Sequence, residues 1–183
     1  MRFIGHDAIG AERARGSAGR LRLSNRATAV LARLVAQHLR PMHLAQAGQI
    51  TRRARYRFFR DLGDDARDLL LLALADASGV AGQAPLDVWS GAGGAVLRSL
   101  MEGAEEAVAV AAAPALLDGD EVMAMAGIGP GPEVGRLLAE LREAQAIGRI
   151  ITREDAIAAI RLARGAGGAG GRSLDTPRDG SIE

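Results

Sequence analysis

The feature of this sequence that most limits its fold is its shortage of residues that favour β-strands. Only five of the 183 residues are aromatic, and alanine, leucine, arginine and glutamate dominate instead. An apolar stripe over residues 29–35 follows the capping pair Ser24 and Asn25, and Thr51 can cap a helix of Arg52 to Leu62. The sequence therefore predicts an all-α protein made of two small helical bundles.

A shift in composition marks the expected domain boundary. Glycine, alanine, proline and serine accumulate over residues 79–93, which predicts a linker. We expect an alanine-rich helix over 95–113, and Asp118 and Thr152 as caps of later helices. The predicted regions are a first helical region at 1–78, the linker at 79–93, a second helical region at 94–164 and a disordered glycine-rich tail at 165–183.

Two absent residue types exclude several kinds of chemistry. The chain has no cysteine, which excludes disulfides, thiolate zinc sites and a cysteine nucleophile. All 23 basic residues are arginine, so Schiff-base lysines and a P-loop lysine are excluded as well. The longest apolar runs, residues 69–75 and 107–117, are shorter than the roughly 20 residues of a membrane span. We expect a cytoplasmic protein that does not act at a membrane.

Charge is distributed unevenly along the chain. Residues 1–67 contain 14 arginines and five acidic residues, whereas the rest contains nine arginines and 17 acidic residues. Such a division predicts a first half that faces a polyanion and a solvated acidic second half.

The strongest candidate for polyanion binding is an arginine cluster interleaved with aromatic residues. Guanidinium groups bind phosphates in a bidentate manner, and three of the five aromatic residues lie in this segment. The alternative is a solvated helix whose aromatic residues, Phe58 and Phe59 among them, simply join the core. The predicted RNA-binding cluster consists of Arg52, Arg53, Arg55, Arg57 and Arg60.

A second candidate for phosphate contact is the glycine-rich turn at residues 129–136. Gly131 and Gly135 flank the expected start of a helix, where free backbone N–H groups favour an anion, and Arg136 lies one turn further on. The alternative is a tight junction between two helices, and Glu133 at the helix start favours that alternative.

The histidines and one helix carboxylate raise the possibility of a metal site. Imidazole nitrogen and carboxylate oxygen suit divalent transition metals, which makes His6, His38 and Asp76 candidate ligands. His38 and His43 are five residues apart with Pro41 between them, so they do not share a helical face. Core or capping roles are the alternative for each residue.

Eight short motifs follow one another along the chain: residues 2–7 (RFIGHD), 20–25 (RLRLSN), 37–41 (QHLRP), 57–63 (RFFRDLG), 74–77 (LADA), 117–123 (LDGDEVM), 129–138 (GPGPEVGRLL) and 152–156 (TREDA). In this order they resemble the C-terminal half of bacterial tRNA nucleotidyltransferases and poly(A) polymerases. The resemblance implies a partial HD-type helical region in residues 1–78 and an RNA-contacting helical tail in residues 94–164. In that comparison His6, His38 and Asp76 fall at metal-liganding positions of an HD-type region.

The resemblance also indicates what the chain lacks. The nucleotidyltransferase head, which would hold Mg²⁺ and the nucleotide, has no counterpart here, so the chain is expected to bind tRNA or another structured RNA without being active alone. Whether it should be called an enzyme stays open. Its other expected partners are a separate catalytic chain or a second copy of itself. In the resemblance, helices that would cover part of the first region also have no counterpart here, so Leu69 to Leu72 are expected to face solvent. The alternatives are an HD-type metal-dependent phosphohydrolase and a helical protein-interaction module.

Overall fold

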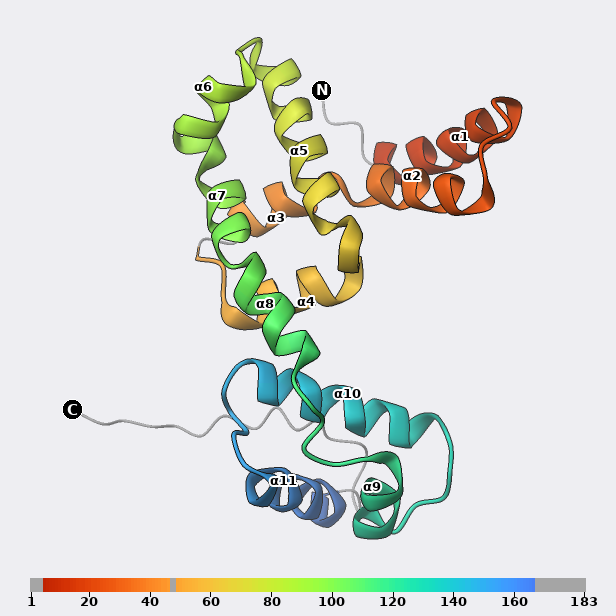
Figure 1. Cartoon of the computed structure of the whole chain (residues 1–183), viewed down its shortest axis with the longest axis vertical. Helices are drawn as coiled ribbons and strands as arrows, with labels where there is room; N and C mark the ends of the chain where they lie inside the picture. Colours follow the sequence, from red (N-terminus) through yellow and green to blue (C-terminus); the bar gives the residue numbers. More distant parts are fainter. Residues whose placement is uncertain (1–4, 47–48, 167–183) are drawn as a thin grey trace, which may run out of the picture. The chain divides into compact units, whose positions relative to one another are not determined.

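The computed structural model describes residues 5–46 and 49–166, and every regular element within them is helical (Figure 1). The all-α prediction is therefore confirmed. The chain divides into two compact units, Met1–Val108 and Ala109–Glu183. No helix in the described part is long and apolar enough to cross a membrane. Most of the tail predicted to be disordered lies outside the described residues.

The first unit begins with a helical hairpin. Helices α1 (His6–Arg20) and α2 (Asn25–Gln37) lie side by side (Figure 1). The two helices approach closely at Gly10, where an added Cβ atom would lie 3.1 Å from Cγ1 of Val35. Ser24 caps α2 as predicted, because its hydroxyl accepts a hydrogen bond from the backbone N–H of Ala27 at 3.2 Å.

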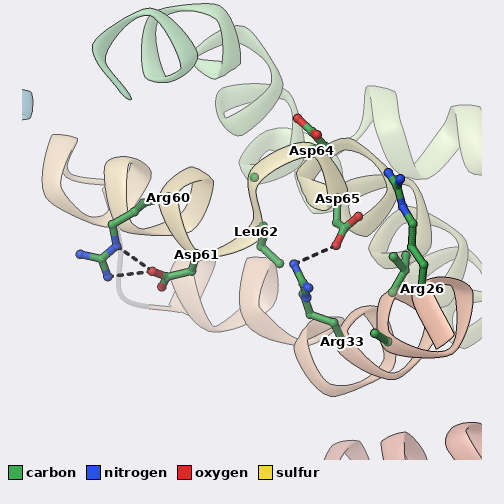
Figure 2. A pocket seen from close by; sticks show the side chains of 10 residues that line it. Arg26, Arg33, Arg60, Asp61, Leu62, Asp64 and Asp65 are labelled. Atoms are coloured by element: carbon green, nitrogen blue, oxygen red, sulfur yellow. Dashed lines mark hydrogen bonds and ion pairs between the residues drawn. The ribbon is translucent and has the colours of Figure 1, made fainter. Parts of the chain in front are cut away.

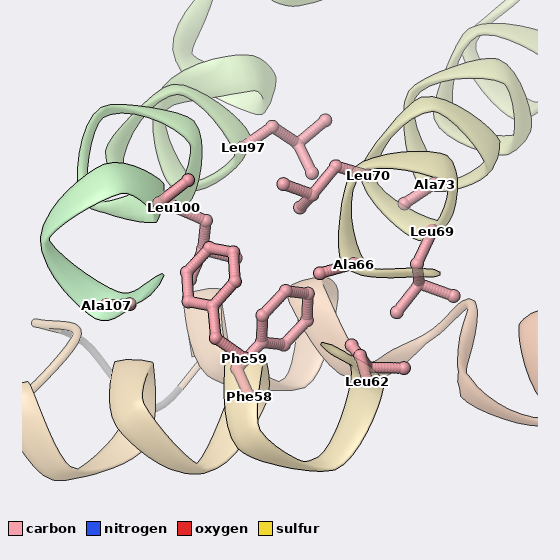
Figure 3. Packing of buried hydrophobic residues seen from close by; sticks show 11 residues of the cluster. Phe58, Phe59, Leu62, Ala66, Leu69, Leu70, Ala73, Leu97, Leu100 and Ala107 are labelled. Atoms are coloured by element: carbon pink, nitrogen blue, oxygen red, sulfur yellow. The ribbon is translucent and has the colours of Figure 1, made fainter. Parts of the chain in front are cut away.

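The rest of the first unit surrounds one apolar core. Phe58 and Phe59 lie at the centre of this core and pack against leucines of the neighbouring helices (Figure 3). Leu69 and Leu70 are buried in it, so the expectation that they face solvent is wrong, whereas Leu71 is exposed. The surrounding helices are α3 (Arg40–Gln46), α4 (Arg52–Leu62), the 3₁₀ turn η1 (Gly63–Asp65), α5 (Ala66–Ala81), α6 (Pro85–Ser90), the 3₁₀ turn η2 (Ala92–Gly94), α7 (Ala95–Glu102) and the first part of α8 (Ala104–Ala112), a helix that crosses the division between the units.

The segment predicted as a linker is folded into this unit. Helix α6 contacts both α5 and α7, Val88 is buried, and Trp89 packs against the core. Arg98 donates hydrogen bonds to the carbonyl oxygens of Trp89 and Gly91, which holds the turn against α7. The division between the units therefore falls between residues 108 and 109, some 15 residues beyond the end of the predicted linker at residue 93.

Among the described residues of the second unit, three helices follow the end of α8: α9 (Gly119–Ala126), α10 (Pro132–Ala146) and α11 (Arg153–Ala166). Val122, Leu137 and Ile160 meet in its core. Asp118 and Glu121 form a reciprocal capping box at the start of α9, with both hydrogen bonds 2.9 Å long. The Glu121 carboxylate also pairs with Arg153, which ties α9 to α11.

Candidate nucleic-acid interface

Helix α4 carries the predicted arginine cluster on a well-anchored scaffold. The Thr51 hydroxyl caps the helix by accepting a hydrogen bond from the backbone N–H of Ala54 at 3.1 Å. Phe58, Phe59 and Leu62 are buried. Phe58 and Phe59 thus join the core, as the alternative interpretation of this segment expects. Their burial fixes which face of α4 reaches solvent, and Arg52, Arg57 and Arg60 are exposed there.

Arg55 differs from the other arginines because its side chain packs inward. Its Nη2 donates to Oγ of Ser99 at 3.2 Å, and a Cβ atom added to Gly103 would lie 2.5 Å from its Cδ. Its Nε is buried without a hydrogen-bond partner in the described part of the chain. Arg55 therefore joins α4 to α7 and to the start of α8, and it is the member of the cluster least available to a ligand.

Asp61 partly neutralises the end of the cluster. Arg40 donates to one carboxylate oxygen at 2.9 Å, and Nε of Arg60 donates to the other at 2.8 Å. Burial raises the pKa of Asp61, but the hydrogen bonds from Arg60 and Arg40 outweigh it and lower the pKa below its ordinary value. The Arg40 guanidinium also lies over the Phe58 ring, 5.5 Å from its centroid.

Asp61 is expected to make the stability of the first unit depend on pH. Because its pKa is lower in the folded chain, its stabilising effect is present above the ordinary carboxyl pKa and is lost as the pH falls through the lowered value. Asp61→Asn should therefore weaken the loss of stability as the pH falls below the ordinary carboxyl pKa. Urea unfolding at several pH values, followed by Trp89 fluorescence, measures this effect. Identical pH profiles for the variant and the unaltered chain would contradict it.

A hollow of about 350 Å³ separates the end of α4 from α2 (Figure 2). Arg26 and Arg33 of α2 line one side, and Arg60 and the acidic residues of the α4–α5 junction line the other. Arg33 pairs with Asp65 at 3.0 Å. Two of the three carboxylates at this hollow, Asp61 and Asp65, are thus held by arginines.

The glycine-rich turn of the second unit lies at the start of α10. A Cβ atom added to Gly131 or Gly135 would meet no described atom within 4 Å, so packing does not explain either glycine. Arg136 pairs with Glu133 and Glu140, each at 2.5 Å, and the hydrogen bond to Glu133 raises its pKa. A phosphate at Arg136 would therefore compete with two carboxylates of the same helix.

The predicted metal ligands are not assembled by the described residues. Nδ1 of His38 donates to the carbonyl oxygen of Val35 at 2.6 Å, and Asp76 is exposed on α5. The side chain of His6 lies outside the described part of the structure, and no cluster of three possible ligands occurs among the side chains that are described. The HD-type metal site stays a prediction.

The sequence reasoning overlooked the arginines of the α1–α2 hairpin. Residues 13–60 contain twelve arginines and no acidic residue, and this run begins well before α4. Counting charges only over residues 1–67 hid this signal, because Asp7, Glu12 and the acids at 61–65 lie at the two ends of that window. Six of the twelve lie on the hairpin: Arg13, Arg15, Arg20, Arg22, Arg26 and Arg33.

Comparison with known proteins links the chain to enzymes that act on tRNA. It is 36% identical over 167 residues to the CC-adding tRNA nucleotidyltransferase of Thermus thermophilus, covering 90% of this chain and 35% of that protein. It is 35% identical over 161 residues to the A-adding tRNA nucleotidyltransferase of Deinococcus radiodurans, covering 87% of this chain and 35% of that protein. The chain thus spans about a third of the length of these relatives. No protein-family model matches the chain, and no solved structure does.

Proposed function

Because this chain is homologous over most of its length to members of the tRNA nucleotidyltransferase family, we propose that it is an RNA-binding portion of such a protein. It holds the tRNA body while a further segment or a separate catalytic chain transfers nucleotides to the 3′ end. Mg²⁺ and the nucleotide then belong to that catalytic part. This role places the protein in the cytoplasm with its tRNA, and self-association is a further way to complete the assembly.

The exposed arginine face of α4 is the observation that carries this proposal. Arg52, Arg57 and Arg60 project from a helix whose opposite face is buried through Phe58 and Phe59. The buried core holds α4 in place, so its backbone does not have to become ordered when the guanidinium groups bind phosphates. The contacts are to the backbone of the RNA, so they position it rather than read its sequence.

The turn at the start of α10 is a second point of contact under this proposal. Gly135 lies on the exposed side of α10, where glycine is less stable than alanine by roughly 0.5–1 kcal/mol, although a Cβ atom would have room there. A close approach of RNA to this backbone explains why a side chain is absent. Gly131 leaves the first N–H groups of α10 similarly open.

The affinity for tRNA should fall steeply with salt, because phosphate contacts release counterions. Each contact adds about 0.7–0.9 to the slope of log affinity against log salt. Arg52→Ala with Arg57→Ala should therefore weaken binding and reduce that slope by about 1.4–1.8. Fluorescence anisotropy with a labelled tRNA at several salt concentrations measures both quantities.

A matched control separates this effect from a general loss of charge. Arg161 is exposed on α11 of the second unit and is not one of the individually named contact residues, so Arg161→Ala should leave the slope unchanged. Circular dichroism should show equal helix content in all variants, since the substituted side chains lie outside the core. An unaltered chain that does not bind tRNA, or binds it without dependence on salt, would refute the proposal.

A further inference from the structure

The turn between α1 and α2 is a second basic surface, separate from the α4 cluster. It presents Arg20, Arg22 and Arg26, and all three side chains are exposed. Arg20 donates a hydrogen bond to the hydroxyl of Ser17 at 2.9 Å, which is a neutral partner. No acidic residue lies within residues 13–60, so no neighbour in sequence reduces the positive charge of the turn.

The backbone of this turn is strained at one of the arginines. Arg22 is the one described non-glycine residue with a positive φ, at 55°. The left-handed conformation costs an L-residue about 1 kcal/mol or more, and glycine would adopt it without that cost. The hydrogen bonds that close the turn, from the N–H groups of Arg22 and Leu23 to Gly19 and Ala18, are backbone contacts that glycine would also make. Within the described structure, nothing in the fold requires an arginine here.

The two leucines of the turn are also exposed. Leu21 has 72% of its surface exposed and Leu23 has 43%. They alternate with Arg20 and Arg22, so the turn combines guanidinium groups with small apolar faces. Such a surface suits a nucleic acid, in which charged phosphates alternate with apolar faces of riboses and unstacked bases.

The hollow described above connects this turn to the α4 cluster. Arg26 lines it from α2 and Arg60 lines it from α4 (Figure 2). At its floor Asp65 is held by Arg33, and Asp61 is held by Arg40 and Arg60. Asp64 also lines the hollow and is exposed. The three arginines and three aspartates that line the hollow balance in charge, so the excess positive charge lies on the turn itself, at Arg20 and Arg22.

We propose that the α1–α2 turn is a second phosphate-binding site for the same tRNA, in which Arg22 and Arg26 contact the RNA backbone. This inference rests on the proposed function and extends its binding surface beyond α4. RNA is favoured over an anionic membrane because the apolar part of the turn is limited to two leucines, whereas membrane-surface helices carry a continuous apolar face.

The sharpest test is Arg22→Gly in the full chain. The substitution removes the guanidinium group and relieves the positive φ, so stability should be unchanged or higher while tRNA binding weakens. If the electrostatic part of the binding free energy is taken as zero at 1 M salt, the loss of one phosphate contact should lower the affinity roughly four- to fivefold at 0.15 M salt. Arg22→Gly with Arg26→Ala should lower it roughly 15- to 30-fold and reduce the salt slope by about 1.4–1.8.

Anisotropy with labelled tRNA and a thermal unfolding curve for each variant give the result, with Arg161→Ala as the control. If the unaltered chain binds tRNA and the turn variants bind it equally well, this inference is overturned while the proposed function stands. If the unaltered chain does not bind tRNA, both fail. Binding to phosphatidylserine vesicles that is lost in the turn variants, with tRNA binding unchanged, would assign the surface to a membrane and also overturn the inference.

Discussion

Replacement of Phe58 by alanine should lower the free energy of unfolding of the first unit by about 3–5 kcal/mol. Phe58 is completely buried, meets Phe59 edge to face with ring centroids 5.3 Å apart, and packs at the centre of the core (Figure 3). The Arg40 guanidinium would also lose its contact with the ring, although it would keep its ion pair with Asp61.

Trp89 provides a probe for this measurement because it is the single tryptophan and packs against the same core. Urea unfolding followed by its fluorescence therefore reports on the first unit. Leu71→Ala is the matched control: Leu71 lies on α5 but has 63% of its surface exposed, so its loss should change stability by less than about 0.5 kcal/mol. Equal effects of the two substitutions would mean that Phe58 is not in the core.

Features that depend on local contacts could be predicted from the sequence. Ser24, Thr51 and Asp118 cap helices where expected, because a side-chain oxygen reaches the backbone N–H groups of the next turn whatever the rest of the chain does. The buried face of α4 was also predictable, since Leu62 follows Phe58 by four residues and Phe59 by three.

Features that depend on distant neighbours could not be predicted in the same way. The helix expected over residues 95–113 is interrupted at Gly103, where Arg55 from α4 occupies the space that a side chain would need. Leu69 and Leu70 are buried by helices that the chain itself supplies. In both cases the contacting residues are far away in sequence, so local helix propensity does not reveal the contact.

The candidate site was predicted in part. The arginine cluster on α4 is exposed at Arg52, Arg57 and Arg60, as a ligand surface requires. Arg55 precedes Phe58, Phe59 and Leu62 by three, four and seven residues, so helical spacing alone already places it on the buried face. The α1–α2 turn was overlooked because its signal is an absence of acids rather than a cluster of arginines.

The segment predicted as a linker supplies a last prediction, because glycines within and beside it should respond in opposite ways. A Cβ atom added to Gly94 would lie 2.3 Å from the carbonyl oxygen of Trp89 and 2.6 Å from its Cα, and these backbone atoms cannot move aside without disturbing α6. Gly94→Ala should therefore destabilise the first unit by about 1–3 kcal/mol or more. Gly79 lies in α5, where a Cβ atom would have open space, so Gly79→Ala should stabilise it by roughly 0.5–1 kcal/mol.

This pair of substitutions distinguishes a folded segment from a flexible one. In a flexible linker both glycines would tolerate alanine, and neither substitution would change the folded state. In the structure one alanine collides with backbone and the other lengthens a favourable helical run, so the two changes in unfolding free energy have opposite signs. Urea unfolding followed by circular dichroism, which avoids any local effect on Trp89 fluorescence, measures both. If neither substitution changed the free energy of unfolding, residues 79–93 would be a flexible linker. Helix α6 would then not pack against the core that supports the arginine face of α4.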